Sequence, residues 1–240
     1  MTETTTITAT ANDIYTLYGY HLFYSTARTT YNGTHSSTTH RIGQDLYSLS
    51  NYSYVYRPTF QFDLSSLSGA TISVATLKVT GAEDYDDTSF THYLYGYTQS
   101  SLTKDSDGFT AYGSTSFASK ASSGYSTTTD GMQYSLNSSG VAYVEDKCGG
   151  NCIFMMRSSR DVGGNTPSGK EYQSVYSSEY ATSAARPHLY LEYESSSSTW
   201  VPKIIMMFAP LKDDLLTWIR TWKPTPLWSL HAAPNGKGIY

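Results

Sequence analysis

Short runs of β-forming residues, each bounded by Gly, Ser, Asn or Asp, recur along most of this chain and constrain its fold more than any other feature. The clearest pair is Tyr54–Asp63 and Thr71–Thr80, which are joined by a turn at 65–69. Further strands are predicted over 13–19, 38–43, 91–97, 131–136, 152–157, 172–177 and 187–193. A slip in the alternation near Ala75 predicts a β-bulge, and residues 138–146 can form a short helical turn. About nine strands with almost no helical periodicity predict an all-β fold, a jelly-roll β-sandwich.

The distribution of aromatic residues divides the chain into two regions. All but one of the 23 tyrosines precede residue 194, whereas all four tryptophans follow it. A serine-rich stretch separates these regions. We therefore expect an N-terminal arm over 1–13, a jelly-roll sandwich over 14–194, a Ser-rich linker over 195–199 and an apolar C-terminal tail over 200–240.

The tail sequence predicts the one convincing amphipathic helix, over 210–222, with Pro210 at its first position and Pro224 as its stop. So apolar a segment outside a completed sandwich needs a covering surface, either its own sandwich or a neighbouring subunit. The linker favours the neighbour. The residues expected to form this assembly tail are Trp200, Leu211, Leu215, Trp218, Ile219, Trp222 and Trp228.

Charge and hydropathy exclude some partners. The formal net charge is −4 without a Lys/Arg cluster, so direct binding of nucleic acid is not expected. The first residues lack the basic and apolar regions of a Sec signal peptide, and no apolar run approaches the about 18 residues of a membrane span. We expect a virion or extracellular assembly made without Sec export.

Several segments together resemble the DNRLRE-type jelly-roll domains. The resemblance rests on residues 57–67 followed by 69–77, and on 155–161, 176–179 and 186–193 in that order. It covers about residues 14–193 and omits the tail. Such domains are similar to certain carbohydrate-binding modules and occur in surface proteins of bacteria and archaea and in phage-like structural proteins. The resemblance therefore implies a jelly-roll fold and a binding or structural role.

The charged residues of the matched segments are interpreted as a buried network that stabilises the sandwich. Arg57 lies inside an otherwise apolar strand, and the other charges lie at predicted strand ends. A buried ion-pair network of this kind would tie the closing strands together. Our hypothesis pairs Arg57 or Arg157 with Glu179, and the alternative is a charged ligand-binding groove. The expected network is Arg57, Asp63, Arg157, Asp161, Glu179 and Arg186.

No motif indicates catalysis, so we expect no enzyme and no cofactor. The six histidines are scattered without metal-ligand spacing, and no Gly-x-Ser-x-Gly elbow has plausible partners. The carboxylates at 83–87 and 105–108 are interpreted as solvated turns, with calcium binding as the alternative. Cys148 and Cys152 lack further zinc ligands, and they form a short loop that a disulfide can close or that can stay reduced.

Two sets of tyrosines alternate onto strand faces: Tyr52, Tyr54 and Tyr56, and then Tyr93, Tyr95 and Tyr97. Tyr rings can line a core, pack a subunit interface or stack on sugars. Because the sandwich region contains no Trp, packing and interface are favoured here, with glycan stacking as the alternative.

These observations predict a non-enzymatic structural or decoration protein of a virus particle or similar surface assembly. It would form a homo-oligomer or join another structural protein, displaying the sandwich and docking the tail on a neighbouring subunit. The alternative is a carbohydrate-binding or adhesin module at a cell surface.

Overall fold

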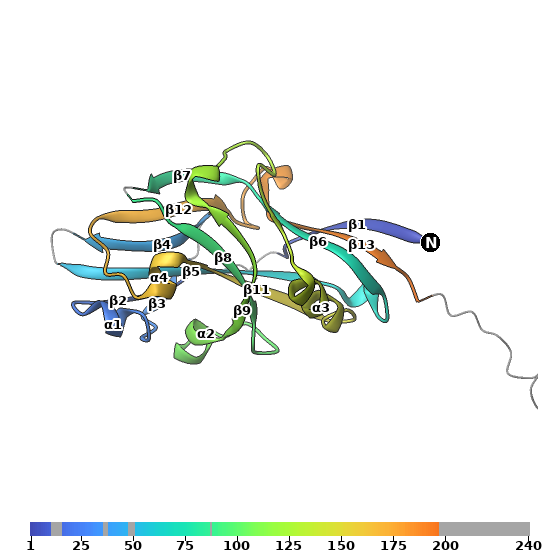
Figure 1. The fold of residues 1–240 in the computed structure, drawn as a ribbon, viewed down its shortest axis with the longest axis horizontal. Helices are drawn as coiled ribbons and strands as arrows, with labels where there is room; N and C mark the ends of the chain where they lie inside the picture. The colour runs from blue at the N-terminus through green and yellow to red at the C-terminus, as the bar shows by residue number, and fades with distance from the viewer. Residues whose placement is uncertain (11–15, 36–37, 48–50, 87, 197–240) are drawn as a thin grey trace, which may run out of the picture. The chain divides into compact units, whose positions relative to one another are not determined.

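Two antiparallel sheets form the β-sandwich of this protein, as the computed structural model shows (Figure 1). The model describes residues 1–10, 16–35, 38–47, 51–86 and 88–196. Over these residues the smaller sheet has four strands in the order β1-β13-β6-β10. The larger sheet has nine, in the order β7-β12-β4-β5-β11-β8-β9, with β2 pairing with both β5 and β3. The predicted jelly-roll-like, all-β sandwich is confirmed.

Most predicted strands are present with small shifts in their bounds. The strands of the described residues are β1 (Thr2–Thr8), β2 (Thr16–His21), β3 (Gly33–His35), β4 (Thr39–Tyr47), β5 (Tyr52–Asp63), β6 (Thr71–Val79), β7 (Gly81–Asp86), β8 (Thr91–Tyr97), β9 (Tyr112–Ala121), β10 (Met132–Ser135), β11 (Asn151–Ser158), β12 (Lys170–Tyr176) and β13 (His188–Glu194). β6 contains a bulge, but it lies at Ser73, which the register with β13 skips opposite the Glu192/Tyr193 step, rather than near Ala75 as predicted.

Short helices connect the strands. They are α1 (Tyr24–Ala27), α2 (Ser106–Thr110), α3 (Ser138–Asp146) and α4 (Ser159–Gly163), with 3₁₀ turns at Ser65–Leu67, Ser122–Gly124 and Ser183–Ala185. The predicted turn at 138–146 is α3, and it begins where the Asn137 side chain accepts a hydrogen bond from Gly140 N. This helix packs against β6 and β9 and buries Val144.

Strands β1, β3, β7 and β9 were not predicted. In β9 the alternation is hard to read because Phe117 is the one buried residue among Ser, Thr, Gly and Lys. The segment expected as an N-terminal arm contains β1, which pairs with β13 along its whole length, from Thr2 opposite Glu194 to Thr8 opposite His188.

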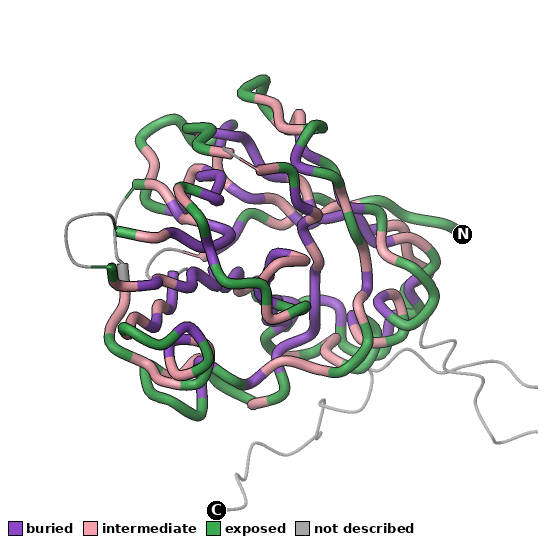
Figure 2. The backbone as a smooth tube through the Cα atoms, turned by 60° about the vertical axis from the view of Figure 1, so that its left-hand side comes forward, coloured by how far each residue is buried: buried purple, intermediate pink, exposed green. Residues whose placement is uncertain are grey.

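Buried side chains lie on both faces of the larger sheet. The main core fills the space between the sheets, and β5 contributes Phe60 and Phe62 to it. Because side chains alternate along a strand, Val55 of β5 points to the opposite face. There it joins a second apolar cluster, which α1 and α2 help to cover with Ala27 and Phe109. Figure 2 shows buried residues along the strands and exposed residues at many of the loops.

Candidate functional site: a tyrosine face and a buried charge network

A row of tyrosines crosses five neighbouring strands of the larger sheet. Tyr18 of β2 lies opposite Tyr56 of β5, which lies opposite Gly43 of β4. Gly43 in turn lies opposite Tyr172 of β12, and Tyr172 opposite Tyr85 of β7. The rings of Tyr56 and Tyr172 meet edge to face over Gly43, with centroids 5.6 Å apart. Strand order alone therefore brings together tyrosines that are far apart in the sequence.

Gly43 makes this ring contact possible. Its φ is +133°, and a Cβ atom there would lie 2.3 Å from the carbonyl oxygen of Glu171 and 2.9 Å from Cα of Tyr172. Any other residue would be strained in this conformation and would collide with the neighbouring strand. The glycine thus leaves space between Tyr56 and Tyr172 on the central strand.

A second row lies one pleat further along the same strands. Tyr20 and Tyr54 are directly opposite each other and stack, with ring centroids 5.3 Å apart and 21° between the planes. Asp45 follows opposite Tyr54, and Lys170 lies opposite Asp45. A charged pair of positions therefore continues the aromatic row.

The predicted tyrosine set on β5 belongs to this face. Tyr54 and Tyr56 stack with an interplanar angle of 14°, and Tyr52 packs edge to face on Tyr20 at 5.6 Å. Tyr47 lies opposite Tyr52 and is 48% exposed. We call this array the tyrosine face; its members are Tyr18, Tyr20, Tyr47, Tyr52, Tyr54, Tyr56 and Tyr172.

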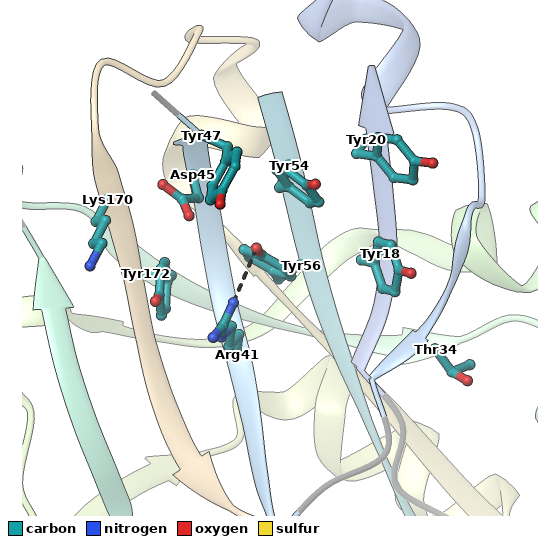
Figure 3. Close-up of a pocket in the computed structure, with 10 residues that line it drawn as sticks. All are labelled: Tyr18, Tyr20, Thr34, Arg41, Asp45, Tyr47, Tyr54, Tyr56, Lys170 and Tyr172. Atoms are coloured by element: carbon teal, nitrogen blue, oxygen red, sulfur yellow. Dashed lines mark hydrogen bonds between the residues drawn. The ribbon is translucent and has the colours of Figure 1, made fainter. Parts of the chain in front are cut away.

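The tyrosine face is hollowed into a groove of about 740 Å³ (Figure 3). This volume lies within the range of small-ligand sites, about 300–1,000 Å³. The groove is lined by Tyr18, Tyr20, Thr34, Arg41, Asp45, Tyr47, Tyr54, Tyr56, Lys170 and Tyr172.

Arg41 is one of the two cations that line the groove, and it lies against Tyr56 and Tyr172. Its guanidinium lies 4.7 Å from the ring centroid of Tyr172 and 5.4 Å from that of Tyr56, and Nη1 donates to the Tyr56 hydroxyl at 3.3 Å (Figure 3). Cation–π contacts of this kind hold the planar group in place. Burial raises the pKa values of the Tyr54 and Tyr56 hydroxyls, so both stay protonated at neutral pH. The groove therefore offers flat apolar rings together with hydroxyl, guanidinium and carboxylate groups for hydrogen bonding.

The second predicted tyrosine set does not form an open face. Tyr93 and Tyr95 contact each other at 6.4 Å, but Tyr95 is 6% exposed and Tyr97 is 1% exposed. Tyr97 belongs to the second apolar cluster, and its hydroxyl accepts a hydrogen bond from Thr103 N. This set packs on the face of the larger sheet that carries the second apolar cluster, where α2 helps to cover it, so it is not an open ligand surface.

Asp161 is the centre of the buried charge network. It is the third residue of α4, and its backbone N donates to the hydroxyl of Ser158, which caps the helix. Arg57 donates to it from Nε at 2.9 Å and from Nη2 at 2.8 Å, and Arg157 donates from Nε at 2.7 Å. Arg28 approaches at 3.4 Å. Asp161, rather than the expected Glu179, is thus the carboxylate that both predicted arginines contact.

Aromatic rings and backbone carbonyls complete the surroundings of Arg57. Its guanidinium lies 4.1 Å from the ring centroid of Phe109, and it donates to the carbonyls of Phe109 and Arg28. Burial alone would raise the pKa of the Asp161 carboxyl, but the charges and hydrogen bonds of Arg57 and Arg157 outweigh burial and hold that pKa well below its usual range. Asp161 and the two arginines thus form a buried ion-pair network that links β5, β11 and α4.

The remaining members of the predicted network lie apart from Asp161. Asp63 is exposed at the end of β5, where it accepts from Ser65 N, and this bond lowers its pKa. Glu179 is exposed in a turn, and Arg186 donates to the Tyr180 carbonyl at 2.8 Å. Asp63 and Arg186 thus form hydrogen bonds with backbone atoms close by in the sequence.

A second buried polar cluster was not predicted. Glu171 of β12 is fully buried and lies 2.6 Å from Arg160 Nε and 2.6 Å from Gln44 Nε2. Gln44 also accepts from the Tyr24 hydroxyl. Alternation could have placed Gln44 and Glu171 opposite the tyrosine face, but their pairing needs the strand order.

The cysteines and acidic clusters show no ligand arrangement. Cys148 and Cys152 are both free, so the disulfide that the sequence allowed is not formed. Asp105 caps α2 by accepting from Gly108 N, and Asp84 accepts from Gln173. In the described residues no group of three His, Cys, Asp or Glu side chains is placed to hold a metal ion.

The predicted assembly tail, 200–240, lies outside the described residues. In the part of the chain that is described, no helix combines the length and apolar character needed to cross a membrane.

Comparison with protein-family models and with curated proteins finds no match for this chain. The fold and the face described above define it as a jelly-roll-like β-sandwich protein with an open tyrosine groove.

Proposed function

We propose that this chain is a non-enzymatic carbohydrate-binding module of a surface or virion assembly, in the manner of the DNRLRE-type domains it resembles. The tyrosine groove is its binding surface. The observation that carries the proposal is the continuous array of Tyr rings around Arg41, open on the face of the larger sheet.

The chemistry of the groove matches a sugar chain. Pyranose rings present flat C–H faces and a rim of hydroxyls, so they need apolar platforms beside hydrogen-bonding groups. Tyr20 and Tyr54 contribute aromatic ring surface to the lining, and Arg41, Asp45 and Lys170 supply polar groups in the same groove. Tyr also costs little conformational entropy when it is ordered by a ligand. The sandwich region contains no Trp, so the aromatic surface of the groove comes from Tyr rings alone.

A glycan array tests the proposal with the full chain and two variants. Tyr54→Ala removes a central platform of the groove, and Tyr190→Ala is the matched control because Tyr190 is half-buried on the smaller sheet. We expect specific binding that falls about fivefold or more in Tyr54→Ala, since one aromatic contact contributes roughly 1 kcal/mol. Tyr190→Ala should bind unchanged. No binding to any glycan, or equal binding by Tyr54→Ala, contradicts the proposal.

A second candidate function is that of a structural or decoration subunit. It is favoured by the apolar residues at helical spacing in 210–222, which follow a serine-rich linker. Under this proposal the tail docks on a neighbouring subunit. Light scattering should then show that a chain lacking 200–240 no longer joins the larger assembly, and an unchanged mass per particle would exclude docking by the tail.

A further inference from the structure

Strand β1 is an open edge of the smaller sheet. In the described residues it pairs with β13 and with no other strand. Ala9 N donates to the carbonyl of Pro187, its opposite residue, at 2.9 Å. Hydrogen-bonded pairs alternate along an antiparallel ladder, so Ile7, Thr5 and Glu3 also bond to β13. The N–H and C=O groups of the even-numbered residues therefore point to the open side.

This edge lacks the features that block pairing at the other edges. β7 carries three carboxylates and a register shift against β12, β9 has two register shifts, and β10 and β3 have four and three residues. Charges, bulges and short length all discourage strand addition. β1 has seven residues, no Pro or Gly and one charge, Glu3, which accepts hydrogen bonds from Tyr193 and Ser195. It is the longest regular edge among the described strands.

The sequence of β1 is complementary to itself. In an antiparallel pairing centred on Thr5, Thr4 lies opposite Thr6 of the second copy, and Thr2 lies opposite its Thr8. These even-numbered pairs are the ones whose backbone groups are directed outward. Glu3 lies opposite Ile7, so no like charges meet, and cross-strand Thr–Thr pairs are favourable.

We propose that two copies of this chain join through β1, so that their smaller sheets become one continuous antiparallel sheet with a two-fold axis beside Thr5. Such an isologous contact closes on itself and leaves the tyrosine face, on the other sheet, free for ligand. The contact rests on the backbone of β1 and is independent of the proposed glycan binding.

Sedimentation velocity on the full chain tests this edge contact. The variant Thr4→Lys with Thr6→Lys places like charges opposite each other across the contact, at exposed positions that leave the bonds to β13 intact. Thr71→Lys with Ser73→Lys is the matched control, since both residues are exposed on β6, two strands inside the edge. We expect the β1 variant to lower the number of 26.6 kDa chains per particle at least twofold, while the control keeps the original number.

A second variant, Thr4→Pro, removes one outward N–H without adding charge and should weaken association in the same direction. Circular dichroism melting shows whether each variant is folded. An unchanged chain that sediments as a monomer overturns the proposal. So does a folded Thr4→Lys, Thr6→Lys variant with the original number of chains per particle.

Discussion

Replacing Asp161 with Asn tests whether the buried charge network stabilises the sandwich. Each carboxylate oxygen has two guanidinium donors: Oδ1 faces Arg57 Nη2 at 2.8 Å and Arg28 Nε at 3.4 Å, and Oδ2 faces Arg57 Nε and Arg157 Nε at 2.9 and 2.7 Å. In either orientation the amide nitrogen of Asn would point its protons at two donors. The substitution also leaves the Arg57 charge buried without a counter-charge.

The expected cost is large. Removing one partner of a buried ion pair destabilises a protein by about 3–5 kcal/mol. For a domain of this size each kcal/mol corresponds to roughly 2–4 °C, so the melting temperature should fall by about 6–20 °C. Urea unfolding followed by circular dichroism gives the free energy directly. Asp146→Asn is the matched control, because Asp146 is an exposed carboxylate paired with Lys147 at 2.7 Å, and it should leave the midpoint unchanged.

The pH dependence of the free energy of unfolding provides a second test of the role of Asp161. Folding lowers the pKa of Asp161, so its contribution is complete above the pKa of an unfolded aspartate, about 4, and is lost as the pH falls toward the folded pKa. The difference between the native chain and Asp161→Asn should stay constant above about pH 5 and shrink at lower pH. If the free energy of unfolding of Asp161→Asn at pH 7 is within about 1 kcal/mol of that of the native chain, Asp161 does not stabilise the sandwich as proposed.

Three further predictions concern single residues. Gly43→Ala should destabilise the fold by about 1–3 kcal/mol in urea unfolding, because its Cβ would lie 2.3 Å from the Glu171 carbonyl oxygen. The control Gly113→Ala should be tolerated, since its Cβ would lie 3.8 Å from the nearest atom. Equal unfolding midpoints of the two variants would contradict this prediction. Burial, with a smaller effect of a nearby lysine, lowers the pKa of His92 to about 3, so protonation favours the unfolded state and stability should fall as the pH drops below about 6.5. His92→Gln should reduce the stability lost between pH 7 and pH 5, and an unaltered loss would count against a buried neutral ring. Cys152 is fully buried and burial raises the pKa of its thiol. In a Cys148→Ser background, which removes the half-buried second thiol, a thiol reagent should label Cys152 only after unfolding, and rapid labelling of the folded chain would show that the site is open.

The fold could be predicted where local alternation and burial agree. β5 and β6 carry strong apolar signals because Phe60, Phe62 and Leu77 enter the core, although β5 is buried on both faces and β6 contains a bulge. Strands at the edges of sheets bury little, so β1, β7 and β9 carry weak apolar signals and were missed. Alternation reports burial, and a strand that buries few side chains shows little of it.

The site was harder to predict because it depends on which strands are neighbours. Arg57 was recognised as a charge inside an apolar strand, but its partner Asp161 is 104 residues away and is positioned by the start of α4. Ser158 and Asp161 have the spacing of a capping box, a local signal for that helix start. Tyr54 and Tyr56 were predicted to share a face, but Tyr18 and Tyr172 join them only through the pairing of β2, β5, β4 and β12.

The most direct measurement of the central claim is a glycan titration followed by NMR of ring-labelled tyrosines. The label suits this chain because it has 23 tyrosines and both sheets of the described residues contain some of them. If the tyrosine face binds sugar, the ring signals of Tyr18, Tyr20 and Tyr54 shift with the bound fraction while those of Tyr190 and Tyr193 stay in place. Shifts confined to tyrosines outside the groove, or no shift with any glycan, would contradict carbohydrate binding at this face.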